Sequence, residues 1–398
     1  MSTTVETPAL QAHKEVMGLD LMRFAAASLV MTYHFLFWHW VPVAHQLTTL
    51  FPGRAPPVPA LQFGWIGVEI FFVLSGFVIA YSASGATPAR FLRSRVLRLA
   101  PGVWICATIS LALYVGVLHR DLVDRLIAYA SSVLFLPIRY IDDVYWTLSI
   151  EIAFYALVWF MLKRGRLDKL EPVMTVIGAG SGLFWVAALS LQTVLAGRTG
   201  ALGLLHLLVL KAEGSRYFQL LLVQHGCLFA TGVLLYEGFK HGFTPRRRLA
   251  AAGLIGACLL EIVGQTGIIA RAAQAPASPL PPMAIWLCAV GLIALSVRYN
   301  AALQTRIPPL RRHARFLGQM TFPLYLLHNA VGLSLTYLCA PWLGVWAIGL
   351  GMAGSVLVAA LVQATAEPVV RRGLAAQIDR LRAARLALGA AKPDVSLP

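Results

Sequence analysis

The chain has 398 residues, of which 58% are hydrophobic and 13% are charged. Because about a quarter of the residues in a soluble domain carry a charge, this composition excludes an ordinary soluble protein and indicates several membrane spans. The net charge of +16 would suit a nucleic-acid partner, but the basic residues lie between hydrophobic runs. We therefore expect a lipid bilayer as the surroundings and no bound nucleic acid.

The hydrophobic runs predict an all-α, polytopic helix bundle. Allowing about 20 apolar residues per span, we expect about ten transmembrane helices, with no internal inverted repeat. They are expected at 19–40, 63–82, 99–118, 145–162, 172–194, 217–237, 249–269, 282–299, 316–339 and 343–365. Two other apolar regions, 119–144 and 201–210, are too short to cross and are expected to be interfacial or re-entrant.

The basic residues predict the orientation of the bundle. With the N-terminus inside, the inner segments hold 24 Lys and Arg and the outer segments hold 8. Such a bias over short loops places both termini in the cytoplasm. We expect a cytoplasmic segment at 1–18, an uncleaved first span, a transmembrane domain at 19–367 and a basic tail at 368–398. The tail would lie either on the anionic inner leaflet or in solvent.

The cysteines give no sign of a disulfide framework or of a metal site. All five lie singly in or beside apolar runs, without a CxxC spacing or a nearby histidine at ligand spacing. They are Cys106, Cys227, Cys258, Cys288 and Cys339. We therefore expect no bound metal.

The first span carries Arg23 near its inner end and His34 deep inside. The two are eleven positions apart, about three helical turns, so they share one face roughly 16 Å apart along the axis. An ionisable group inside a span is costly and marks a functional site. The alternative is that Arg23 extends to the headgroups and His34 is only a packed histidine.

Two carboxylates are expected at the depth of His34. Glu69 follows the start of the second span and Glu151 the start of the fourth, which predicts one shared interior site. A carboxylate beside His34 would fix its tautomer and prepare it as a general base. The sequence leaves open which glutamate does this, and Glu69 could instead pair with an arginine.

Basic and polar groups also gather on two other spans. Arg95 and Arg98 precede Pro101, where the third span is expected to begin, and with Arg23 they would form a mouth suited to phosphates. Arg90 and Arg93 are better explained by topology alone. In the ninth span Tyr325, His328 and Asn329 are expected to form a polar interior face, or else His328 is simply packed.

These motifs together resemble acyltransferase family 3, the integral membrane O-acyltransferases. The markers are Arg23 with His34, GVEIFFVLSGF, Arg95 and Arg98 followed by Pro101, WTLSIEIAFY, FPLYLLH and EPVVRR, in that order along most of the chain. Two departures are Glu69, where an aspartate is frequent, and Thr-Phe-Pro in place of a Ser-Tyr pair before Leu324. Neither changes the order of the motifs.

The resemblance implies an enzyme of a bacterial inner membrane. It would transfer an acyl group, usually acetyl, from acyl-coenzyme A to a hydroxyl of a carbohydrate or glycoside. Acyl-CoA is then the donor, and no metal is implied. Some relatives append an extracytoplasmic domain, so this chain would act alone or with a separate extracytoplasmic partner. The expected catalytic residues are His34, Glu151 and Glu69; those that bind CoA are Arg23, Arg95 and Arg98; those that contact substrate are Tyr325, His328, Trp146 and Ser149.

Two questions stay open in the sequence. Transfer could be direct, with His34 as general base, or could pass through an acyl-histidine. The competing class of protein is a transporter or flippase, in which the buried His and Glu would relay protons. Nothing in the residues names the acceptor or the length of the acyl chain.

Overall fold

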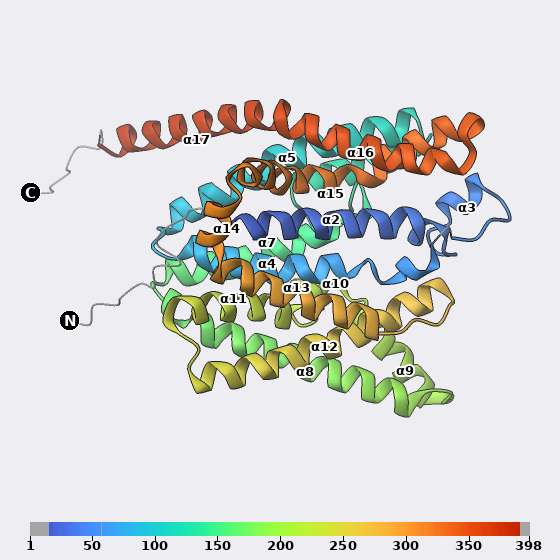
Figure 1. The fold of residues 1–398 in the computed structure, drawn as a ribbon, viewed down its shortest axis with the longest axis horizontal. Helices are drawn as coiled ribbons and strands as arrows, with labels where there is room; N and C mark the ends of the chain where they lie inside the picture. The colour runs from blue at the N-terminus through green and yellow to red at the C-terminus, as the bar shows by residue number, and fades with distance from the viewer. Residues whose placement is uncertain (1–15, 57, 391–398) are drawn as a thin grey trace, which may run out of the picture.

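A computed structural model describes residues 16–56 and 58–390, which form α-helices and short 3-10 helices without a β-strand. The long helices lie side by side in one bundle (Figure 1). They are α2 (Met17–Leu36), α4 (Ile66–Ala83), α5 (Pro88–Gly116), α7 (Trp146–Lys163), α8 (Leu170–Leu195), α11 (Gly226–His241), α12 (Pro245–Ala273), α13 (Leu280–Arg298), α15 (Pro308–Leu343), α16 (Ala347–Ala364) and α17 (Ala366–Ala390). The short elements are η1 (Trp38–Trp40), α3 (Gln46–Leu50), η2 (Pro59–Phe63), α6 (Leu122–Val133), η3 (Asp143–Tyr145), η4 (Leu167–Lys169), α9 (Gly200–Glu213), α10 (Arg216–Leu220), α14 (Asn300–Arg306) and η5 (Gly344–Trp346).

The predicted all-α, polytopic bundle is confirmed. Eight helical stretches of the described residues are long and apolar enough to cross a membrane, and the last of these, Leu310–Ala384, runs through α15, α16 and much of α17. The predicted span at 217–237 corresponds to α10, a break and the 16-residue α11. The start of α2 and the end of α17 lie at the same end of the bundle (Figure 1). That this end is cytoplasmic stays a prediction.

The third predicted span begins earlier than expected. Its helix, α5, starts at Pro88 and not near residue 99, and Pro101 lies inside it. The reason is local: Thr87 accepts a hydrogen bond from the backbone N–H of Arg90, and proline suits the first position of a helix. Arg95 and Arg98 therefore lie on the helix itself, almost one turn apart.

Helices α4 and α11 cross in direct backbone contact. A Cβ atom added at Gly76 would lie 2.2 Å from the carbonyl oxygen of Phe229, and one at Gly232 would lie 2.1 Å from that of Val73. No side chain fits there, so glycine at both positions is what lets the helices approach. This crossing fixes the start of α11 against α4.

The chain is not helical just before α11, where a continuous span was expected. Residues 221–225 form turns, with Leu222 at φ 59°. The backbone groups that lose their partners within a helix are satisfied by neighbouring side chains. For example, the carbonyl oxygen of Gln224 accepts hydrogen bonds from the side chains of Ser181 and Trp185. Irregular backbone at this depth is tolerated because protein surrounds it. The break turns the His225 side chain into the bundle.

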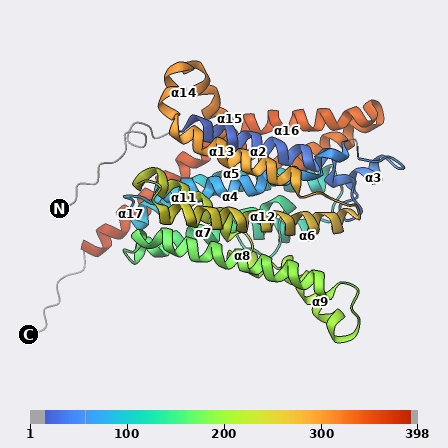
Figure 2. The same cartoon turned by 60° about the horizontal axis from the view of Figure 1, so that its bottom comes forward.

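The ends and the short helices complete the fold. The predicted non-spanning regions form α6 and α9, and α9 projects from one end of the bundle (Figure 2). The tail continues as α17, where Asp379 pairs with Arg93 of α5 at 2.8 Å. Most of the predicted N-terminal segment, residues 1–15, and the last residues, 391–398, lie outside the described part of the chain.

Candidate functional site

An inner cavity of about 120 Å³ lies between α2, α4, α5, α7 and α15. Its lining includes Arg23, Arg95 and Arg98, together with Glu151 and Tyr325. The three arginines that were grouped from the sequence therefore do line one cavity. They arrive from two helices, α2 and α5, that are separated in the chain by α4.

The arginines of this cavity differ in how they are held. Arg23 forms an ion pair with Asp20 at 2.8 Å. Arg95 instead lies 5.6 Å from the ring centre of Tyr155, and Arg98 lies 5.9 Å from that of Phe322. Within the described chain neither Arg95 nor Arg98 forms an ion pair. Their guanidinium groups are held on aromatic faces and keep N–H donors for an anionic ligand.

Arg90 and Arg93 belong elsewhere, in agreement with their separation from the site in the sequence analysis. Arg93 pairs with Asp379, and Arg90 donates to the carbonyl of Gly85. Neither residue lines the inner cavity. The two arginines make useful controls for that reason.

His34 is paired with a second histidine, His328 of α15. The Nδ1 atom of His328 lies 2.9 Å from the carbonyl oxygen of Tyr325, so it must donate, and Nε2 of the neutral ring then accepts. His34 Nδ1 lies 3.0 Å from that Nε2 and 2.9 Å from the carbonyl of Val30, so it carries the hydrogen. This assignment leaves Nε2 of His34 with a free lone pair.

A polar chain adjoins the histidine pair. Asn329 donates to a carboxylate oxygen of Asp142 at 3.0 Å, so its own carbonyl oxygen accepts from Nε2 of His39, at 3.1 Å. The hydroxyl of Tyr114 donates to the other oxygen of Asp142 at 2.5 Å. Burial raises the pKa of Asp142, and its hydrogen bonds from Tyr114 and Asn329 oppose that shift. The rings of His34 and His39 lie 5.6 Å apart, centre to centre.

An outer cavity of about 830 Å³ opens beside these groups. Its lining includes His34, His39, Asp142, Asn329 and Tyr114, and it extends over α3. Among the residues that the structure describes, none lines both the outer and the inner cavity. Two side chains of α15 lie between the two cavities. They are His328 and Tyr325, and the hydroxyl of Tyr325 lies 3.1 Å from that of Thr147.

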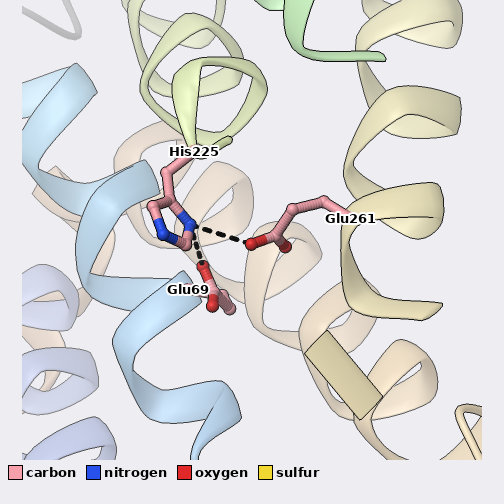
Figure 3. A group of neighbouring side chains, drawn as sticks. All are labelled: Glu69, His225 and Glu261. Atoms are coloured by element: carbon pink, nitrogen blue, oxygen red, sulfur yellow. Dashed lines mark hydrogen bonds and ion pairs between the residues drawn. The ribbon is translucent and has the colours of Figure 1, made fainter. Parts of the chain in front are cut away.

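The predicted pairing of His34 with a glutamate is wrong. Glu151 lies on the inner cavity and accepts hydrogen bonds from Ser75, at 2.9 Å, and from Tyr155. Glu69 lies instead against His225, with Glu261 of α12 (Figure 3). Counting residues from helix ends carried no information on the direction in which each side chain points.

Two residues expected to contact substrate lie outside both cavities. Trp146 packs on His225, with ring centres 5.7 Å apart, and under the guanidinium of Arg216. The hydroxyl of Ser149 lies 3.0 Å from that of Tyr140. Both side chains thus hold α7 to its neighbours, whereas Tyr325 lines the inner cavity and His328 contacts His34.

Sequence reasoning missed several polar groups of the site. His39 lies in η1, where the chain leaves the helical path of α2, so its position did not follow from the spacing to His34. Asp142 stands in a loop, and its partners are 28 and 187 residues away. The one available signal was Asn329, next to His328.

Comparison with known proteins bears on this arrangement. The family described as "Acyltransferase domain" matches residues 17–364. The chain belongs to this acyltransferase family. It is a membrane O-acyltransferase, and the family favours that enzyme class over a transporter.

The chain is also similar to curated proteins. The chain is 26% identical over 348 residues to the exopolysaccharide production protein ExoZ of Rhizobium meliloti (strain 1021), covering 81% of this chain and 95% of ExoZ. It is 28% identical over 194 residues to nodulation protein 10 of Rhizobium leguminosarum bv. viciae, covering 43% of this chain and 50% of that protein. No solved structure matches the acyltransferase chain significantly.

Proposed function

We propose that this acyltransferase moves an acetyl group from acetyl-CoA, bound from the cytoplasm, to a hydroxyl of a polysaccharide on the outer side of a bacterial inner membrane. The observation that carries the proposal is the pair of cavities on either side of His34 and His328. Three arginines and one glutamate line the inner cavity, whereas two arginines, two aspartates and many uncharged polar groups line the outer one. An acyl donor and an acceptor of different charge would enter from opposite ends.

The inner cavity suits the donor. Arg95 and Arg98 lack carboxylate partners among the described residues and would bind the phosphates of CoA, with Arg23 deeper along α2. The pantetheine arm is uncharged and narrow, which suits the remaining lining, where Phe71, Phe72 and Leu326 lie with Ser75 and Thr147. The thioester would then arrive beside Tyr325 and Thr147, next to the histidine pair.

His34 supplies the base in this scheme. Its Nε2 lone pair accepts the proton of the acceptor hydroxyl, the oxygen attacks the thioester carbonyl, and the C–S bond breaks. The departing thiolate of CoA takes up the proton, which leaves His34 neutral. His328 holds the required tautomer by accepting from Nδ1 of His34, a role filled by a carboxylate in many other histidine bases.

The outer cavity suits a carbohydrate. It is larger than the inner cavity, and Trp38, Tyr114 and Tyr337 on its lining offer flat apolar faces for sugar rings. His39, Asn329 and Asp142 offer hydrogen-bonding groups for hydroxyls. The name of ExoZ refers to exopolysaccharide production, which supports a polysaccharide as the acceptor.

The test is acceptor-dependent release of CoA thiol. Purified protein in detergent or nanodiscs is given acetyl-CoA with candidate polysaccharides, and the thiol is followed with a chromogenic disulfide. Mass spectrometry of the glycans from cells with and without the protein identifies the acetylated sugar. Hydrolysis of acetyl-CoA at the same rate with and without every acceptor, and unchanged glycans, would count against the proposal.

The same experiment separates direct transfer from an acyl-histidine. In direct transfer, protein incubated with radiolabelled acetyl-CoA alone keeps no label after rapid denaturation. A stable label that is lost in His34→Ala would replace the direct step with attack by Nε2 on the thioester, followed by a second attack by the hydroxyl.

A further inference from the structure

A second polar cluster lies apart from both cavities. It consists of Glu69 of α4, His225 at the start of α11 and Glu261 of α12, and all three side chains point toward one another (Figure 3). One ligand atom from each lies within 4.8 Å of the others, and the three residues are at most 2% exposed. We propose that this cluster binds one transition-metal dication, of the kind represented by Zn²⁺, as a structural site.

Hydrogen bonds alone leave the cluster unsatisfied. His225 Nδ1 lies 2.9 Å from Glu261 Oε1 and 3.7 Å from Glu69 Oε2 (Figure 3). A single N–H can serve only one of these carboxylates well. Three buried atoms of the cluster, Glu69 Oε2, Glu261 Oε2 and His225 Nε2, have no hydrogen-bond partner within the described chain. Nδ1 therefore faces two carboxylates at once, as a metal ligand would.

The charge of the cluster points to the same conclusion. Two ionised carboxylates around a neutral imidazole carry a charge of −2, deep in a medium of low dielectric constant. In the described residues no lysine or arginine forms an ion pair with Glu69 or Glu261. A dication balances this charge, and the start of α11 adds only the partial positive charge of a helix N-terminus.

The ligand set selects the class of metal. One imidazole nitrogen and two carboxylate oxygens suit Zn²⁺, Mn²⁺ or Fe²⁺, whereas Ca²⁺ and Mg²⁺ prefer oxygen ligands alone. Zinc would bind at about 2.0–2.2 Å from each atom, and the three ligand atoms already lie within 4.8 Å of one another. No open path to solvent is needed for a structural site, because the ion can enter while the bundle folds.

The site would join three helices that also meet through packing and through the contact of Thr231 with Cys258. It fastens α12 and the start of α11 to α4, at a different level from the α4–α11 glycine crossing at Gly76 and Gly232. Phe72 connects it to the chemistry, since its ring lies 5.2 Å from that of His225 and also lines the inner cavity. The metal would therefore fix the wall of the donor cavity without touching the acyl group.

The test measures metal in the intact chain. Protein made in medium supplemented with zinc is purified without chelator, dialysed against EDTA, and then unfolded in SDS with a colorimetric zinc indicator, alongside elemental analysis for Zn, Mn and Fe. We expect about one metal ion per chain, retained through EDTA and released only on unfolding. Negligible metal in the wild-type chain overturns the proposal and leaves a cluster neutralised by shared protons.

Variants show where the ion lies. Glu261→Gln and His225→Asn should lose at least nine-tenths of the bound metal. Glu213→Gln is the matched control, because Glu213 is equally buried but pairs with Arg271 at 2.8 Å on another part of the fold; it should keep the full amount. Equal metal in all three variants also overturns the proposal. Acyl transfer is assayed separately, so failure here leaves the proposed function standing.

Discussion

Two histidines of this bundle stand in opposite surroundings. His34 lies on a cavity, its donor faces another neutral imidazole, and its Nε2 is free. His225 is sealed from solvent with two carboxylates directed at its Nδ1. A histidine between two carboxylates is the arrangement more often associated with catalysis, yet His225 and its two partners are buried away from any substrate. The contrast teaches that access to a cavity, rather than the number of charged neighbours, is the reason to propose His34 and not His225 as the reactive histidine.

The largest effect is expected at the accessible histidine. His34→Ala removes the proposed general base and should lower the turnover number about 10²–10⁴-fold, with the protein still folded in the membrane. Thiol release gives the rate, and gel filtration in detergent checks the fold. Substantial remaining transfer would remove His34 from the mechanism and with it the contrast drawn above.

The sealed histidine cluster is expected to act on stability. Glu261→Ala removes one of the three proposed metal ligands. Loss of the ion would leave Glu69 without a counter-charge in the interior and should cost about 3–5 kcal/mol of unfolding free energy. Thermal unfolding followed by tryptophan fluorescence measures the change. A variant as stable as the wild type, but with reduced turnover, would move this cluster into the catalytic site.

A smaller and more specific effect is expected for the donor arginines. Arg98→Ala removes charged hydrogen bonds worth about 1.5–3 kcal/mol, so the KM for acetyl-CoA should rise about 10- to 100-fold while the turnover number changes less. Arg90→Ala is the control, since Arg90 lies outside the inner cavity. Equal effects of the two variants would indicate a general electrostatic attraction instead of a binding site.

The smallest effect is expected on the acceptor side. Asp142→Asn replaces a carboxylate that accepts hydrogen bonds from Tyr114 and Asn329. Since Asn329 in turn accepts a hydrogen bond from His39, the variant should hold His39 less firmly. At about 1 kcal/mol per neutral hydrogen bond, the KM for the acceptor should rise about fivefold. The KM for acetyl-CoA should stay constant, and a matched rise there would argue against two separate cavities.

The sequence carried much of the fold because helices in lipid must satisfy their backbone internally. Apolar runs therefore predicted the long helices. The shared position of Arg23, Arg95 and Arg98 near one end of the predicted spans indicated the residues that line the inner cavity. The sequence did not predict how each helix is rotated about its own axis, which sets the direction of its side chains. Glu69, Glu151 and His34 were predicted to lie at the same depth in one shared site, but their side chains point into three different sites.

The partners across the bundle were also beyond reach. His225 and Glu261 come from segments 156 or more residues after Glu69, joined only by the packing of α4, α11 and α12, and His225 is aimed by a break that a hydropathy window smooths over. Pairs such as His34 with His328 are set by which helices adjoin, and a single sequence does not contain that order.

None of the described residues lines both cavities, and this separation has a consequence for the membrane. A membrane that holds an ion gradient would lose it through a water-filled passage. With Tyr325, Thr147 and the imidazole pair standing between the cavities, an acyl group could be handed from one side to the other while the electrical insulation of the membrane stays intact.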